Sequence, residues 1–539
     1  MEQIVDRYFS LMAENYPVIC ASDEFYFFPR VRESLSFLDR VDDFDRDKIE
    51  GNIDVVKGLL QELDGVDETC LGLEERIDLE LIRNSMLSFL REFDEVKVWQ
   101  RDPAFYLKIV LMGIDGAMTK PCSSKEDLVR RLLSRLKAVP GLLEQMGRNL
   151  NNVSWLYAEV SHEIKSDCID FFNFSVTQFI HRNCDGNEEL LEANNGVMEH
   201  LDRFDAVLER SIGDDSFFVG KEGMHQILRE SYGCEKSMDE LEELGNEGHS
   251  ATLGELERLK NKVNPQKSWQ EIYEGFQIEL LSQRDLLNLY KSEFENIKGF
   301  CEKRGLIGPF NHRELYIRET PLYLRALRAS ASYCAPVSGD VNEEAIFYIS
   351  PSKELLKRRG KGPYVVDDIH REYILTTAHE AYPGHHLLDT IRGELKSAVR
   401  RQLENPLFYE GWSCYSEHLL REEGYLQDSV QVLIGLKRDL WRYTRCTLDV
   451  GLQTGGFGCD EGAEKLMELG VTPSEAMKQV KRYAMMPGYQ LSYAAGKQEI
   501  LSLRARHASR LGLKTFHNVL LTGGQLPFKW VGKMMEREN

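Results

Sequence analysis

The chain has 539 residues and a formal net charge of −21. This length is enough for two or more domains, or for one large helical body that encloses a catalytic cleft. The acidic charge excludes a general electrostatic attraction to nucleic acid or to anionic membranes, so we expect neither as a partner. The chain starts with neither a basic segment nor an apolar run of signal-peptide length, and its eleven cysteines form no C-x-x-C pair. Both features predict a cytoplasmic protein with reduced thiols.

The first 328 residues predict one helix after another. Apolar residues recur at three- and four-residue spacing in three long segments, residues 77–93, 128–146 and 269–294. Breaks are expected at residues 100–105, 212–223 and 234–248, and in the last of these Ser237 can cap a helix together with Glu240. We therefore expect an N-terminal helical region over residues 1–328.

The composition changes at residue 329. Residues 329–368 are rich in Gly, Pro and Ser around a short β-prone run from Ala345 to Ser350, which is the best strand candidate in the chain. Such a strand can be an edge to which an extended peptide adds by backbone hydrogen bonds, or a buried connector. Helices resume at Asp367, so residues 329–539 form a second predicted region.

The stretch "TTAHEAYPGHHLLD", residues 376–389, is similar to the H-E-x-x-H helix of zinc hydrolases, but its histidines are spaced differently. In a regular helix, residues six apart lie about 120° apart around the axis and residues seven apart lie about 10 Å apart along it, too far to share one zinc ion. Pro383 cannot bond the carbonyl of His379, and Gly384 permits a bend, so two looped-out residues would bring His385 to the second ligand position. His386 is the alternative ligand, or else a residue beside the substrate.

A third ligand is expected from the helix in "NPLFYEGWSCYSEHLL", residues 405–420. Asn405 and Pro406 are typical of a helix start, and Glu410 and Glu417, seven residues apart, share one face with aromatic side chains. Either glutamate alone could be solvated. Buried with the histidines and without a metal, however, these groups would leave several polar atoms unsatisfied, at about 1–3 kcal/mol each.

The remaining candidates surround this set. Glu380, next to the first histidine, is the candidate general base. In residues 436–456, Asp449 could orient a histidine, or could pair with Arg445 along the helix.

In residues 481–500, Tyr489 or Tyr493 could donate to an oxyanion, and Arg482 or Lys497 could hold a substrate carboxylate. A structural role is the alternative for each of these four residues.

Three segments, "HEAYPGHH", "EGWSCYSE" and "PGYQLSYAAGK", resemble the family catalogued as domain of unknown function 885, whose pattern is H-E-x-x-P-G-H, E-G-W-x-x-Y-x-E and a late P-x-Q-x-x-x-Y-x-x-G. That family is related to the gluzincin metallopeptidases, which are helical zinc enzymes. The resemblance implies His379, His385 and Glu410 as zinc ligands, Glu380 as base and Tyr493 as the oxyanion donor. Three positions depart from the family pattern: Gln453, Phe457 and Tyr489, the last of which stands where Gln is expected.

The sequence and the resemblance together predict a mainly α, elongated, multi-helical body with a deep cleft and a small edge-strand region near the zinc helix. The expected function is zinc-dependent hydrolysis of short peptides, by an oligopeptidase or a carboxypeptidase-like enzyme. The alternatives are another metal-dependent amide or ester hydrolase, and a non-catalytic binding protein whose metal is either structural, with four protein ligands, or absent. Manganese and cobalt remain alternatives to zinc.

Overall fold

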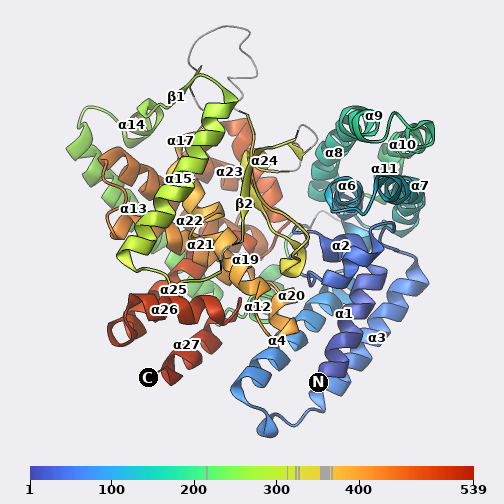
Figure 1. Cartoon of the computed structure of the whole chain (residues 1–539), viewed down its shortest axis with the longest axis horizontal. Coiled ribbons are helices and arrows are strands. Elements are labelled where there is room, and N and C mark those ends of the chain that lie inside the picture. Colours follow the sequence, from blue (N-terminus) through green and yellow to red (C-terminus); the bar gives the residue numbers. More distant parts are fainter. Residues whose placement is uncertain are drawn as a thin grey trace.

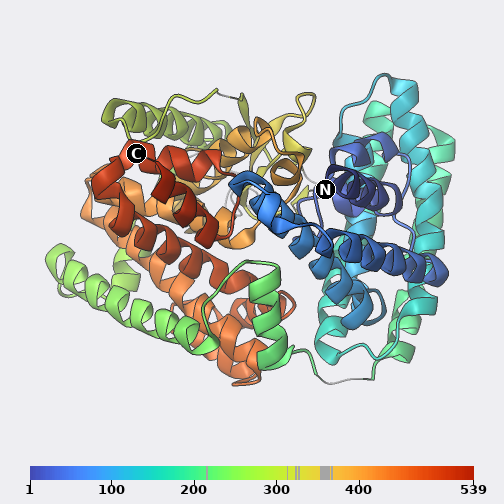
Figure 2. The same ribbon diagram turned by 90° about the horizontal axis from the view of Figure 1, so that it is seen from below.

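The computed structural model describes the chain except for residues 214–215, 312, 322–323, 326–327, 352–363, 366–367 and 539. The protein is mainly helical, as expected. Figure 2 shows the helices of the first 211 residues on one side of the molecule and the later helices on the other, with the start of α4 reaching across. The helices of the first side are α1 (Glu2–Asn15), α2 (Pro17–Ala21), α3 (Arg46–Asp64), α4 (Leu73–Leu90), α5 (Val98–Arg101), α6 (Pro103–Thr119), α7 (Lys125–Asn149), α8 (Trp155–Asp170), α9 (Thr177–Asn183), α10 (Glu188–Leu201) and α11 (Phe204–Ser211).

The second side holds the small sheets and the rest of the helices (Figure 1). Before residue 368 its elements are α12 (Gly220–Glu230), α13 (Met238–Val263), α14 (Trp269–Gly275), β1 (Glu279–Leu280), α15 (Gln283–Arg304), β2 (Leu315–Glu319), β3 (Ala331–Cys334), β4 (Ala345–Ile349) and β5 (Tyr364–Val365). From residue 368 they are α17 (Asp368–Arg371), α18 (Tyr373–Glu380), α19 (His385–Gly393), α20 (Ala398–Gln402), α21 (Pro406–Glu422), α22 (Ser429–Thr454), α23 (Cys459–Met467), α24 (Pro473–Ala484), α25 (Tyr489–Leu511), α26 (Leu513–Thr522) and α27 (Phe528–Arg537).

The breaks expected at residues 100–105 and 212–223 contain gaps between helices, but the break expected at residues 234–248 is wrong after residue 237, because residues 238–248 belong to α13. Ser237 and Glu240 form a capping box at the start of α13, and the Asn405 side chain accepts hydrogen bonds at the start of α21. The single helix expected over residues 269–294 is wrong, because the structure divides it into α14 and α15. The Ser282 side chain accepts a hydrogen bond from the Asp285 N–H, so a new helix begins there.

The predicted strand is present as β4, but it is not an edge. β4 is the central strand of a three-stranded sheet, parallel to β2 and antiparallel to β3. The edges are β2 and β3, two strands that the sequence analysis did not predict. The edge strand β3 packs against α18, and its Tyr333 N–H donates to Glu380 at the end of that helix.

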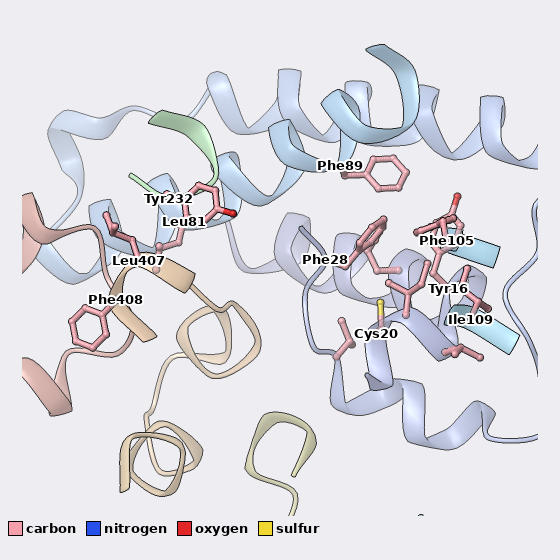
Figure 3. Close-up of a cluster of buried hydrophobic side chains, with 14 of the residues drawn as sticks. Tyr16, Cys20, Phe28, Leu81, Phe89, Phe105, Ile109, Tyr232, Leu407 and Phe408 are labelled. Carbon is pink, nitrogen blue, oxygen red and sulfur yellow. The ribbon is translucent and has the colours of Figure 1, made fainter. Parts of the chain in front are cut away.

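The largest buried cluster continues from the N-terminal helices to α21. Figure 3 shows Tyr16, Phe28 and Phe89 on one side of this cluster and Leu407 and Phe408 of α21 on the other. The boundary expected at residue 328 remains a prediction, and this cluster contains side chains from both sides of it. The N-terminal helices are thus packed against the segment that carries Glu410.

Candidate metal centre

The two histidines lie on two separate helices. The chain leaves α18 at Ala381 and starts α19 at His385, so the irregular spacing is produced by a break between helices instead of a bulge within one. A Cβ atom on Gly384 would lie 1.9 Å from the carbonyl oxygen of His379 and 2.4 Å from that of Ala378. Only glycine allows this close approach, which places the start of α19 against the last turn of α18.

Helix α21 brings Glu410 to both histidines. Its Oε2 lies 3.2 Å from the Nε2 of His379 and 3.6 Å from the Nε2 of His385. All three side chains are buried, and their ligand atoms lie within 4.8 Å of one another. Two ligands bound at about 2.0–2.1 Å in a tetrahedral site are about 3.3 Å apart, so these spacings suit one zinc ion.

Each histidine is held through its other ring nitrogen. The Nδ1 of His379 lies 2.9 Å from Oε1 of Glu417, and the Nδ1 of His385 lies 2.9 Å from the hydroxyl of Ser413. Glu417 and Ser413 are both on α21, the helix that carries Glu410. Metal-binding histidines commonly make such contacts, which fix the ring and direct Nε2 toward the ion.

Buried cations hold Glu417 in its charged form. Arg438 and Arg442 of α22 donate to both of its oxygens over 2.5–3.0 Å. Burial opposes the charge, but the two guanidinium groups and His379 keep the pKa of Glu417 well below its usual range.

Glu372, just before α18, repeats this arrangement. It accepts from Lys437, Arg438 and Tyr273. Burial opposes its charge, yet Lys437 and Arg438 lower its pKa to about 2.

Charge also decides the protonation of His379 and Glu410. Burial disfavours a charged imidazole, but Cys414, Glu410 and Glu417 lie against His379 and hold its pKa well above the ordinary value. Burial likewise opposes the Glu410 carboxylate, while His379 and His385 hold its pKa well below normal. A bound metal cation would replace the proton that the imidazole of His379 otherwise carries.

Tyrosines line the partly exposed side of the set. The Tyr489 hydroxyl donates to Oε1 of Glu410 over 2.6 Å, which leaves Oε2 directed at the histidines. The ring of Tyr493 lies 6.4 Å from that of His379 and nearly parallel to it. Tyr409 stacks on His385 with ring centroids 3.9 Å apart.

Glu380 follows His379 at the end of α18 and is partly exposed. Its Oε2 accepts a hydrogen bond from the backbone N–H of Tyr333 over 2.8 Å. Tyr333 is on the edge strand β3, so the candidate base and the edge of the sheet are adjacent.

The other predicted residues lie outside the three-residue set. His386 packs edge-on against Tyr333 and Phe294, and its role beside the substrate stays a prediction. The carboxylate of Asp449 accepts from the backbone N–H groups of Gly488 and Leu491 at the start of α25. Glu417, and not Asp449, is the carboxylate that holds the Nδ1 of His379.

The three candidate cations also have other contacts. Arg445 donates to Gln490 and lies over the ring of Tyr493, so it does not form the expected simple pair with Asp449. Lys497 is buried and donates to Asp439 over 2.6 Å, which removes it as an anchor for a substrate carboxylate. Arg482 is half-exposed beside Glu163 and lines a cavity of about 200 Å³.

Ser413, Tyr333 and Tyr26 were missed by the sequence analysis. Tyr26 comes from the loop after α2 and stacks on Tyr489 with ring centroids 4.4 Å apart. It is far from the histidine segment in the sequence and belongs to no motif. No local signal could have identified it.

The protein is therefore a mainly helical protein with a buried His–His–Glu set suited to one divalent metal ion. It belongs to the family described as bacterial proteins of unknown function (DUF885), whose model matches residues 31–535.

Two solved structures have the same fold over nearly the whole chain. A "putative lipoprotein of unknown function" from Shewanella oneidensis is 19% identical, with a TM-score of 0.76, and the match covers 99% of this chain and 98% of that one. A "putative lipoprotein" from Colwellia psychrerythraea is 14% identical, with a TM-score of 0.77 and 99% coverage of both chains. No curated protein matches the chain. Within the described residues, no helix is both long and apolar enough to cross a membrane.

Proposed function

We propose that the protein is a zinc-dependent hydrolase of short peptides. The observation that carries the proposal is the convergence of two Nε2 atoms and one carboxylate oxygen. The candidate base Glu380 follows His379 directly at the end of α18. Two histidines and one glutamate are the ligand set of several catalytic zinc sites, which leave a further position for water or substrate. Zinc bound there would act as a Lewis acid toward a carbonyl group and toward water.

The side chains of the protein have separate roles in this proposal. Glu380 takes a proton from the attacking water and passes it to the leaving amine. Tyr493 donates to the oxygen that becomes negatively charged, and Glu417 and Ser413 hold the imidazoles in place. An extended peptide that adds to the edge of β3 would bond other backbone groups of this strand, because Glu380 already accepts from the Tyr333 N–H.

A set of three protein ligands favours catalysis over a purely structural metal site. A structural zinc site usually has four protein ligands. Among the residues described, the set contains His379, His385 and Glu410, while the His386 ring packs against aromatic side chains. Arg482 remains the candidate anchor for a substrate carboxylate in a carboxypeptidase-like reaction.

The first test is metal content, measured by mass spectrometry on protein purified without chelator or affinity metal. We expect about one zinc per chain in the wild type and in His386→Ala, and its loss in His385→Ala. About one manganese or cobalt ion per chain in place of zinc would support the metal site but correct the identity of the metal. A wild type that binds none of these ions, even when they are offered, would overturn the proposal.

Activity is then tested with short peptides, small amides and esters, using metal-loaded wild type and Glu380→Gln. We expect the wild type to cleave peptides, and Glu380→Gln to lose at least about 100-fold in rate while keeping its metal. Cleavage of the amides and esters alone would replace the peptidase assignment by the broader hydrolase one.

A further inference from the structure

A cavity of about 380 Å³ lies between the N-terminal helices and the start of α25. One wall is the loop after α2, residues 24–28, and another is formed by α12 and the residues just before it. Phe28, Phe105 and Tyr232, which are labelled in Figure 3, contribute to its lining. The cavity therefore belongs to neither side of the molecule alone.

Ten of the 27 residues that line the cavity are aromatic, and seven are charged. Besides those three rings the lining includes Phe25, Tyr26, Phe27, Tyr157, Phe217 and Phe218. A cavity of this size with such a wall favours a ligand group that is large, flat and apolar.

Several charged groups of the lining are already bound within the protein. Arg91 donates to Glu92 and lies over the ring of Phe27. Asp102 accepts a hydrogen bond from Ala104 at the start of α6. Glu24 and Lys108 also line the neighbouring cavity that contains Arg482, so this polar pair lies where the two cavities meet. The aromatic part of the wall is thus the part that an apolar group of a ligand would contact.

The cavity shares a wall residue with the candidate metal centre. Tyr489 lines the cavity, stacks on Tyr26 and donates to Glu410. A group seated in the cavity is therefore one aromatic ring away from a candidate metal ligand. That separation suits the side chain of a residue next to the bond that is cleaved.

We propose that this cavity is the specificity pocket of the enzyme and receives one large aromatic side chain of a peptide substrate. This inference rests on the proposed function, because it assumes that peptides bind at the metal centre. Tyr26 and Tyr489 form the side of the pocket nearest the metal. Residues of α12 form a more distant wall, where a larger side chain would fill the space without touching the metal ligands.

The test is binding of pentapeptides to zinc-loaded Glu380→Gln, measured by calorimetry. The probes are pentaalanine and the five peptides that carry a single Phe in place of one Ala. We expect one position at which Phe strengthens binding about tenfold or more, the effect of burying an aromatic ring. In Gln226→Trp, on the cavity wall, this preference should disappear, and in His225→Trp, on the exposed side of the same helix, it should persist.

A second variant, Val219→Phe, narrows the same wall and replaces Gln226→Trp if that protein does not fold. Equal binding of all six peptides, or a Phe preference that survives both cavity variants, would overturn the pocket assignment even if the wild type cleaves peptides. A Phe preference that the cavity variants abolish would support the pocket even if no peptide is cleaved. If the preference is abolished and no peptide is cleaved, the pocket assignment is supported and the proposed hydrolysis is contradicted.

Discussion

At the scale of single residues, the candidate site depends on charge compensation in a buried environment. His379 lies between two carboxylates, Glu410 and Glu417, and Glu417 is in turn bound by Arg438 and Arg442. Each buried charge has a partner of opposite sign, so removing one member leaves the others uncompensated. Glu417 therefore contributes to the fold as well as to the position of the His379 ring.

Replacing Glu417 by Gln should weaken both metal binding and the fold. We expect zinc affinity to fall by about 10- to 100-fold, because the His379 ring loses its charged acceptor. Stability should fall by about 3 kcal/mol, because two buried guanidinium groups lose their counterion. Zinc titration against a competing chelator and urea unfolding measure the two effects.

Glu422→Gln, on the same helix but in a surface pair with Arg504, is the matched control and should cost less than about 1 kcal/mol. Equal behaviour of the two variants would contradict the assigned role of Glu417.

The two tyrosines of α25 should respond differently to loss of their hydroxyls. Tyr489→Phe leaves Oε1 of Glu410 buried without its donor, so we expect zinc affinity to fall by about tenfold. Tyr493→Phe should bind zinc normally but lower kcat, since its hydroxyl is assigned to the transition state. Zinc titration and steady-state kinetics on both variants separate the roles. If Tyr493→Phe lost zinc affinity and Tyr489→Phe lost only kcat, the two assigned roles would have to be exchanged.

At the scale of elements, the site is assembled by close approaches between helices. The turn between α18 and α19 is held to α21 by a hydrogen bond of 2.7 Å from the Trp412 indole N–H to the carbonyl of Pro383. Helices α21 and α25 cross at Gly411 and Gly496, where a Cβ on Gly496 would lie 1.9 Å from the carbonyl oxygen of Leu407. This crossing brings Tyr489 within hydrogen-bonding distance of Glu410.

Gly384→Ala tests the turn between α18 and α19, the two helices that carry the histidines. Its Cβ would overlap the His379 carbonyl, so α19 must move and His385 with it. We expect zinc binding to be lost and thermal stability to fall, as read by metal content and a melting curve. Gly299→Ala, in the middle of α15 with no atom near its Cβ, is the control and should stabilise the helix by about 0.5–1 kcal/mol. Normal zinc binding by Gly384→Ala would contradict this prediction, because it would show that the turn between α18 and α19 tolerates a side chain.

At the scale of the whole molecule, distant segments meet around the histidine helices. The loop after α2 provides Tyr26 beside Tyr489, and Arg30 from the same loop bonds Glu404 and the carbonyl of Ala335. On another side, Glu372 joins α14, α18 and α22 through Tyr273, Lys437 and Arg438. The site is therefore held from several directions by segments that are far apart in the sequence.

The Glu372 contacts predict part of the acid sensitivity of the molecule. Its pKa is lowered to about 2 in the folded protein, so the stability it contributes is present above its unfolded pKa, near 4.5, and is lost as the pH falls toward 2. Between pH 5 and pH 2 the wild type should lose about 3 kcal/mol more than Glu372→Gln. Urea unfolding across this range measures the difference. Glu274→Gln, exposed on α14, should follow the wild type, whereas parallel curves for Glu372→Gln and the wild type would refute the assignment.

Local chemistry in the sequence predicted the helical class and much of the site. Apolar spacing located α4 and α7, Asn405 and Pro406 marked the start of α21, and the histidine segment together with Glu410 identified the side chains that meet. These features depend on neighbours within a few turns of chain, so one segment is enough to read them.

Only the tertiary structure decided how the histidine spacing is accommodated and which residues surround the set. At the Pro-Gly pair, helix α18 ends and helix α19 begins. This break places His385 toward Glu410 and His386 toward Tyr333. The contacts of Asp449 and Lys497, the edge position of β3 and the approach of Tyr26 depend on helices separated by tens to hundreds of residues. Such contacts follow from the packing of whole elements, which no single segment of the sequence encodes.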